Sequence, residues 1–176
     1  MKTEKLKKTV SAALFMAIIC VATYVVQIPI PATGGYANLG DCFVLTAGYI
    51  LGAGYGAVAA GLGSALADIL AGYVQYAPAT FVIKALVAVS AYFIFKAVDK
   101  AISKKNSVIS RIISSTVSES FMIIGYFIYE ALILGYGKAA VGSIIPNTVQ
   151  GIFAVITSVI ISTAISKIRI NNLNKG

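Results

Sequence analysis

Side chains that can carry charge or form strong hydrogen bonds lie inside otherwise apolar stretches: Asp68, Lys84, Glu119, Glu130, Asn147 and Gln150. An ionisable group in a membrane-spanning helix costs about 2.5–3.5 kcal/mol on insertion scales, so it usually has a partner or a binding role. Asn147 and Gln150 are three positions apart and share a helix face, which suits hydrogen bonding to a polar heterocycle. The alternative is that the two amides join neighbouring helices.

Asp68 and Lys84 lie eight positions on either side of Tyr76, which is the centre of a short link. In an antiparallel helical hairpin they reach a similar depth, and we expect them to form a structural ion pair. The alternative is that Lys84 also reaches a ligand. Glu130 lies near the outer end of its segment. Glu119 lies near the middle, where it is protonated, hydrogen-bonded or facing a wet cavity.

The composition excludes several classes of protein. Of 176 residues, 59% are hydrophobic and only 11% are charged, against about 25% charged in a soluble domain. The net charge is +8, but a chain with so few charged residues has no face that could follow a phosphate backbone. Nucleic acid is therefore not an expected partner. The chain has no His and two Cys, which leaves no His-based catalysis and no evident metal-ligand set. We expect no enzyme activity, catalytic residue, metal or cofactor.

The hydrophobic pattern predicts an all-α membrane protein, a bundle of six transmembrane helices in one domain over 1–176. The predicted spans are about 9–30, 39–54, 55–75, 78–97, 108–134 and 142–166. Six spans place twelve of the 14 Lys and Arg residues on one side, including Lys104, Lys105, Arg111 and Lys175. The positive-inside rule therefore predicts a cell-membrane protein with both termini in the cytoplasm.

The first outer loop, Pro29 to Asn38, is rich in Pro and Gly and cannot be helical throughout. We expect Asn38 to be the N-cap of the next helix, with Asp41 in its first turn. Polar groups gather beneath this loop, which predicts a small-molecule pocket that opens outward. Thr80, Lys84, Tyr126 and Glu130 are candidate contacts there.

Several segments carry a family resemblance. They are Ala13-x-x-x-Ala17, the run 35–41 (GYANLGD), the run 61–68 (GLGSALAD), the run 76–84 (YAPATFVIK) and Pro146-Asn147-x-x-Gln150. With them the chain resembles, over nearly its whole length, the substrate-binding S components of energy-coupling factor (ECF) transporters. The resemblance is strongest to the branch with riboflavin-, pyridoxine- and hydroxymethylpyrimidine-type members.

The resemblance implies a subunit that captures a vitamin from outside, with Asn147 and Gln150 as ligand contacts and Tyr36 and Asn38 in a lid. It implies that Ala13 and Ala17 dock on a transmembrane coupling subunit. Two cytoplasmic ATPases would complete the transporter complex. Small residues four apart would equally allow packing within the chain's own bundle. The chain has no Trp, so ring stacking would use Tyr or Phe.

Two further classes of function remain open. A structural scaffold with an S-component-like fold predicts no pocket and no ligand. A small ion-coupled carrier, acting as a dimer, predicts uptake without ATPases and a requirement for Glu119. An intramembrane enzyme is the least favoured class, because no His or metal set is present.

Overall fold

The computed structural model describes residues 2–102 and 107–173; Lys104, Lys105 and Lys175 of the expected charge pattern lie outside them. Five α-helices are joined by a hairpin and two short helices. The elements are α1 (Lys2–Val25), β1 (Gln27–Ile30), β2 (Gly35–Asn38), α2 (Asp41–Leu70), α3 (Ala77–Ala101), α4 (Ser107–Ile128), the π-helix η1 (Tyr129–Ile133), the 3-10 helix η2 (Gly137–Ser143) and α5 (Ile144–Leu173).

Among the described residues, five helical segments are long and apolar enough to cross a membrane. The expected spans 39–54 and 55–75 lie together in α2, which is broken at Gly52 by a positive φ of 82°. A Cβ on Gly56 would lie 3.0 Å from the carbonyl oxygen of Ala47. Residues nine apart in a continuous helix are about 13 Å apart along the axis, so α2 turns back at the break. The six expected helices are therefore not confirmed as six separate elements.

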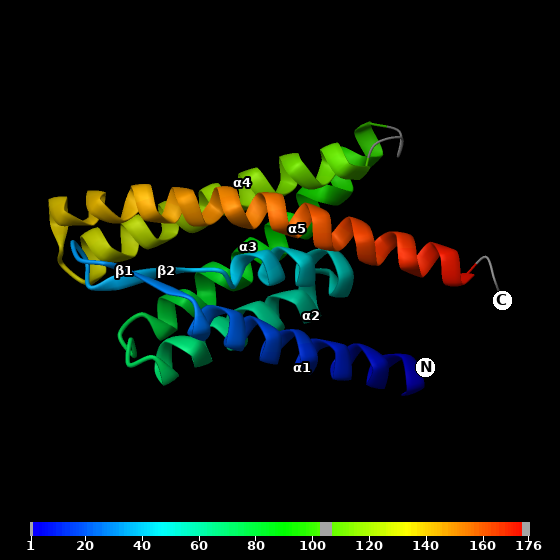
Figure 1. Cartoon of the computed structure of the whole chain (residues 1–176), viewed down its shortest axis with the longest axis horizontal. Coiled ribbons are helices and arrows are strands. Elements are labelled where there is room, and N and C mark those ends of the chain that lie inside the picture. The colour runs from blue at the N-terminus through cyan, green and yellow to red at the C-terminus, as the bar shows by residue number, and fades with distance from the viewer. Residues whose placement is uncertain (1, 103–106, 174–176) are drawn as a thin grey trace.

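The hairpin and the chain termini lie at opposite ends of the bundle (Figure 1). Strands β1 and β2 are antiparallel, with Gln27 opposite Asn38 and Ile30 opposite Gly35. The ends of α1 and α5 that carry the N- and C-termini lie together at the other end. The expectation that the Pro29–Asn38 loop is not helical is confirmed.

Glycines allow the helix backbones to approach closely. A Cβ on Gly48 would lie 2.5 Å from the carbonyl oxygen of Ala88, and one on Gly63 would lie 2.6 Å from that of Met16. These contacts bring α2 against α3 and α1. Many large apolar side chains point outward, as expected for a lipid-facing surface.

The buried side of α4 instead carries polar side chains. Ser110, Ser114, Ser115 and Ser118 are fully buried. Arg111, one of the charges expected near a loop, is also buried; its guanidinium donates to the hydroxyls of Ser107 (3.0 Å) and Ser166 (2.9 Å). Arg111 therefore ties α4 to α5 near the end that holds the termini.

Candidate substrate-binding site

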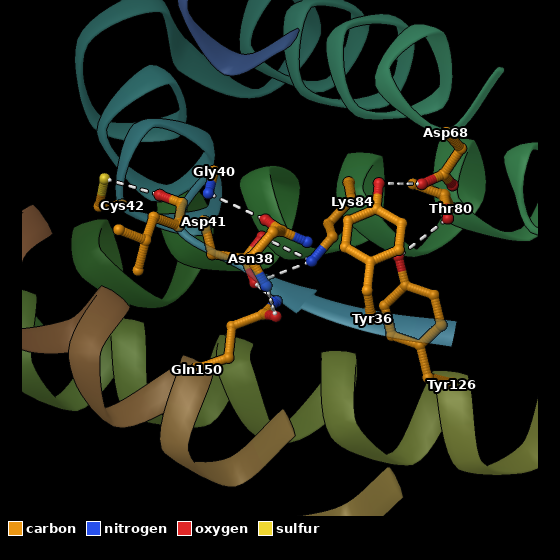
Figure 2. Close-up of polar contacts among 11 residues, drawn as sticks. Tyr36, Asn38, Gly40, Asp41, Cys42, Asp68, Thr80, Lys84, Tyr126 and Gln150 are labelled. Carbon is orange, nitrogen blue, oxygen red and sulfur yellow. Dashed lines mark hydrogen bonds and ion pairs between the residues drawn. The ribbon is translucent and has the colours of Figure 1, made fainter. Parts of the chain in front are cut away.

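A polar cavity lies beneath the hairpin, between α2, α3, α4 and α5 (Figure 2). All eight residues expected to contact a substrate line it: Tyr36, Asn38, Thr80, Lys84, Tyr126, Glu130, Asn147 and Gln150. They come together because polar side chains on apolar helices avoid lipid by facing one another. Their role in binding remains a prediction.

The ion pair in this site joins Lys84 to Asp41. The Lys84 ammonium lies 2.6 and 2.8 Å from the two carboxylate oxygens of Asp41, and both side chains are 1% exposed. The expected pairing of Lys84 with Asp68 is therefore wrong. Because α2 reverses its direction at Gly52, the part of α2 before Gly52 also runs beside α3. This places Asp41 next to Lys84.

Gln150 of α5 connects the ion pair to the hairpin. Its Nε2 donates to Asp41 Oδ2 (2.5 Å), and its Oε1 accepts from the backbone N–H of Asn38 (2.6 Å). The Asn38 side chain accepts from the backbone N–H of Gly40 (2.9 Å). Gly40, and not Asn38, is the residue that precedes the first turn of α2, so the expected N-cap is wrong by two positions. Asp41 does lie in the first turn.

Two tyrosines attach the hairpin to buried carboxylates. The Tyr36 hydroxyl donates to Oδ1 of Asp68 (2.5 Å). The Tyr76 hydroxyl lies 3.0 Å from the carbonyl oxygen of Thr33 and 3.2 Å from Oε1 of Glu130, so one proton serves two acceptors. The hairpin is thus held by α2, α5 and the start of α3.

Both tyrosines lie outside the membrane-spanning helices, and both have a raised pKa. Burial is the largest cause in each case. For Tyr36 the charge of Asp68 and its hydrogen bond raise the pKa further. For Tyr76 the neighbouring Thr33 side chain lowers the pKa, whereas the nearby charge of Glu130 raises it. The two hydroxyls therefore stay protonated and act as donors at neutral pH.

Further polar groups complete the lining. The hydroxyls of Thr80 and Tyr126 are hydrogen-bonded at 2.9 Å. Within the described residues, four buried oxygens of the lining have no hydrogen-bond partner: Thr23 Oγ1, Ser64 Oγ, Asp68 Oδ2 and Glu130 Oε2. The side chain of Glu130 is 2% exposed, so it does not sit at a wet interface. The cavity therefore offers both hydrogen-bond donors and acceptors.

Four lining residues were not expected: Thr23, Ile30, Ser64 and Tyr76. Thr23 and Ser64 are small polar residues of the kind common in helix interfaces, so their type gives no specific signal. Tyr76 was treated as the centre of a link. Its place at the start of the run 76–84, which carries the family resemblance, was the available signal.

Glu119 lies outside this cavity. It lines a separate groove between α4 and α5, is 3% exposed, and both of its carboxylate oxygens lack a hydrogen-bond partner among the described residues. Ala13 and Ala17 are exposed on α1. Ala13 lines an apolar groove of about 540 Å³ between α1 and α2.

The fold and site define a multi-pass membrane protein with a polar cavity at one end of its helices. The family model described as "ECF-type riboflavin transporter, S component" matches residues 3–168. The chain therefore belongs to this family, whose members are substrate-binding subunits of vitamin transporters. It is also similar to the "Uncharacterized protein in gap 3'region" of Pyrococcus woesei, with 34% identity over 139 residues, which cover 78% of this chain and 87% of that relative.

Proposed function

We propose that the protein captures a small heterocyclic vitamin or precursor of the pyridoxine, hydroxymethylpyrimidine or riboflavin class on the outer side of the cell membrane. It then passes this ligand to a transmembrane coupling subunit for uptake driven by two cytoplasmic ATPases. The observation that carries the proposal is the convergence of Asn147, Gln150 and the three tyrosines Tyr36, Tyr76 and Tyr126 on one cavity. Side-chain amides form hydrogen bonds with ring nitrogens and carbonyl groups, and phenol rings provide a flat apolar surface for a ring to pack on.

The proposed topology has the cavity outside and both termini in the cytoplasm. If the two parts of α2 on either side of Gly52 count as separate passes, the chain crosses or enters the membrane six times. Lys5, Lys7 and Lys8 at the start of α1 then follow the positive-inside rule. Lys138, at the hairpin end, is the exception.

The hairpin is the proposed lid. The cavity has a volume of about 20 Å³, room for about one water, whereas pockets for small ligands measure about 300–1,000 Å³. Ligand entry therefore requires a movement, and the hairpin is the non-helical element that lies over the cavity. Release of the Asn38–Gln150, Tyr36–Asp68 and Tyr76–Thr33 hydrogen bonds would free it.

The exposed Ala13 and Ala17 are the proposed contact with the coupling subunit. Both residues are on the lipid-facing side of α1, and small side chains let a second helix approach closely in lipid. This contact is separate from the cavity, so docking and ligand capture should be separable by mutation.

The deciding experiment is identification, by mass spectrometry, of small molecules extracted from protein purified in detergent. A stoichiometric B-vitamin or precursor supports the proposal, and Asn147→Ala or Gln150→Ala should then lower its occupancy at least tenfold. Gln75→Ala, a change of the same kind at an exposed position, is the control. An empty protein with no thermal shift across a B-vitamin panel contradicts the proposal and favours a scaffold.

A further inference from the structure

The cavity carries an excess of negative groups. Three carboxylates, Asp41, Asp68 and Glu130, meet a single cation, Lys84, among the described residues of the cavity and its ion pair. Lys84 is committed to Asp41, which it contacts through both oxygens (Figure 2). Asp68 and Glu130 therefore have no cation of their own in the site.

Each of these two carboxylates accepts a hydrogen bond on only one of its two oxygens. Tyr36 donates to Oδ1 of Asp68, and Tyr76 donates to Oε1 of Glu130. The second oxygens, Asp68 Oδ2 and Glu130 Oε2, are buried without a partner in the described structure. The side chains are only 4% and 2% exposed. Buried polar groups without a partner are uncommon in proteins, and such a pair in one cavity points to a ligand that supplies the missing donors.

We propose that the ligand is the unphosphorylated form of a vitamin or precursor, which donates hydrogen bonds to Asp68 and Glu130, and that phosphate esters of the same molecule are rejected. This inference rests on the proposed function and adds to it the charge and hydrogen-bonding class of the substrate. A phosphate would bring its negative charge close to two carboxylates that have no ion-pair partner among the described residues. At about 6 Å and an effective dielectric of about 20, one such repulsion lowers affinity roughly a hundredfold.

The test compares matched pairs of ligands on the purified protein in detergent: pyridoxine with pyridoxine 5′-phosphate, riboflavin with its 5′-phosphate, and hydroxymethylpyrimidine with its phosphate. Isothermal titration calorimetry gives the dissociation constants. We expect one unphosphorylated compound to bind and its ester to bind at least about a hundredfold more weakly. An ester that binds equally or more tightly overturns the inference while the proposed function stands. Failure of every compound in the panel overturns both.

Three isosteric variants locate the effect. Asp68→Asn and Glu130→Gln each remove one charge, and each should reduce the preference for the unphosphorylated form by tenfold or more. Glu4→Gln is the matched control: it makes the same change as Glu130→Gln at an exposed position of α1 that does not line the cavity. A preference that is unchanged in Asp68→Asn and Glu130→Gln, in protein with a normal melting temperature, contradicts the assignment of these carboxylates.

Discussion

The Lys84 ammonium lies within 2.8 Å of both carboxylate oxygens of Asp41, and the pair is closed off from solvent. Gln150 donates to the same carboxylate. The pair therefore links α2, α3 and α5 at the bottom of the cavity, and it fixes the shape against which a ligand must fit.

Removal of one partner should destabilise the protein strongly. Lys84→Met leaves Asp41 buried and uncompensated, and such a loss costs about 3–5 kcal/mol. Asp41→Asn together with Lys84→Met should cost less than the sum of the two single changes. Unfolding in mixed micelles measures both effects, with Lys138→Met at an exposed position as the control. Additive costs would show that the two side chains do not interact.

The hydrogen bond from Tyr36 to Asp68 should slow opening of the hairpin. A hydrogen bond to a charged group contributes about 1.5–3 kcal/mol, so Tyr36→Phe should speed ligand dissociation by about tenfold or more. Stopped-flow measurement of the dissociation rate checks this, and Tyr136→Phe on the exposed link before η2 serves as the control. An unchanged rate would mean that the hairpin does not gate the cavity.

The raised pKa values of Tyr36 and Tyr76 predict a loss of stability in alkali. Their pKa is raised from 10.0 in the folded state, so above pH about 10 the unfolded chain loses these protons while the folded chain keeps them. Stability therefore falls as the pH rises through that range. The melting temperature should fall less steeply above pH about 10 in Tyr36→Phe than in the wild type. Parallel curves for the two proteins would contradict the prediction.

Two glycines of α2 provide a matched pair for testing the packing. Gly48→Ala would place a methyl group 2.5 Å from a backbone oxygen of α3, whereas a Cβ on Gly54 meets nothing within 4 Å. Overpacking costs about 1–3 kcal/mol. Gly54→Ala should be neutral or stabilising by up to about 1 kcal/mol, because Ala is the better helix former. Thermal melting distinguishes the two, and equal effects would argue against close contact between α2 and α3.

A bulky residue on the exposed face of α1 should separate docking from capture. Ala13→Trp or Ala17→Trp should abolish co-purification with the coupling subunit while leaving ligand affinity within about twofold. Ile160→Trp, at another lipid-facing position, should preserve both. Complex formation by both alanine variants would place the docking surface elsewhere.

The sequence predicts the helical class and the composition of the cavity well, since a polar residue in an apolar helix must face inward. It predicts pairings less well. The partner of Lys84 was inferred from equal distances to Tyr76, which compares only the two helical segments that this link joins. Asp41 belongs to the preceding expected span, 39–54, and a contact between positions 41 and 84 has no local sequence pattern. The two strands of the hairpin were also not predicted, because their Pro- and Gly-rich sequence indicates only the absence of a helix.

The reversal at Gly52 also determines how the hairpin is able to move. Asp41 is eleven residues from the break and Asp68 sixteen, so the start of α2, which follows β2, lies about 7–8 Å deeper in the bundle than Asp68. In the proposed topology the hairpin is then a re-entrant segment, with the end of β2 at the depth of the lipid tails. Backbone groups left unpaired in hydrocarbon cost several kcal/mol each. On that topology the hairpin does not move sideways into lipid, and we expect it to lift along the membrane normal, toward water.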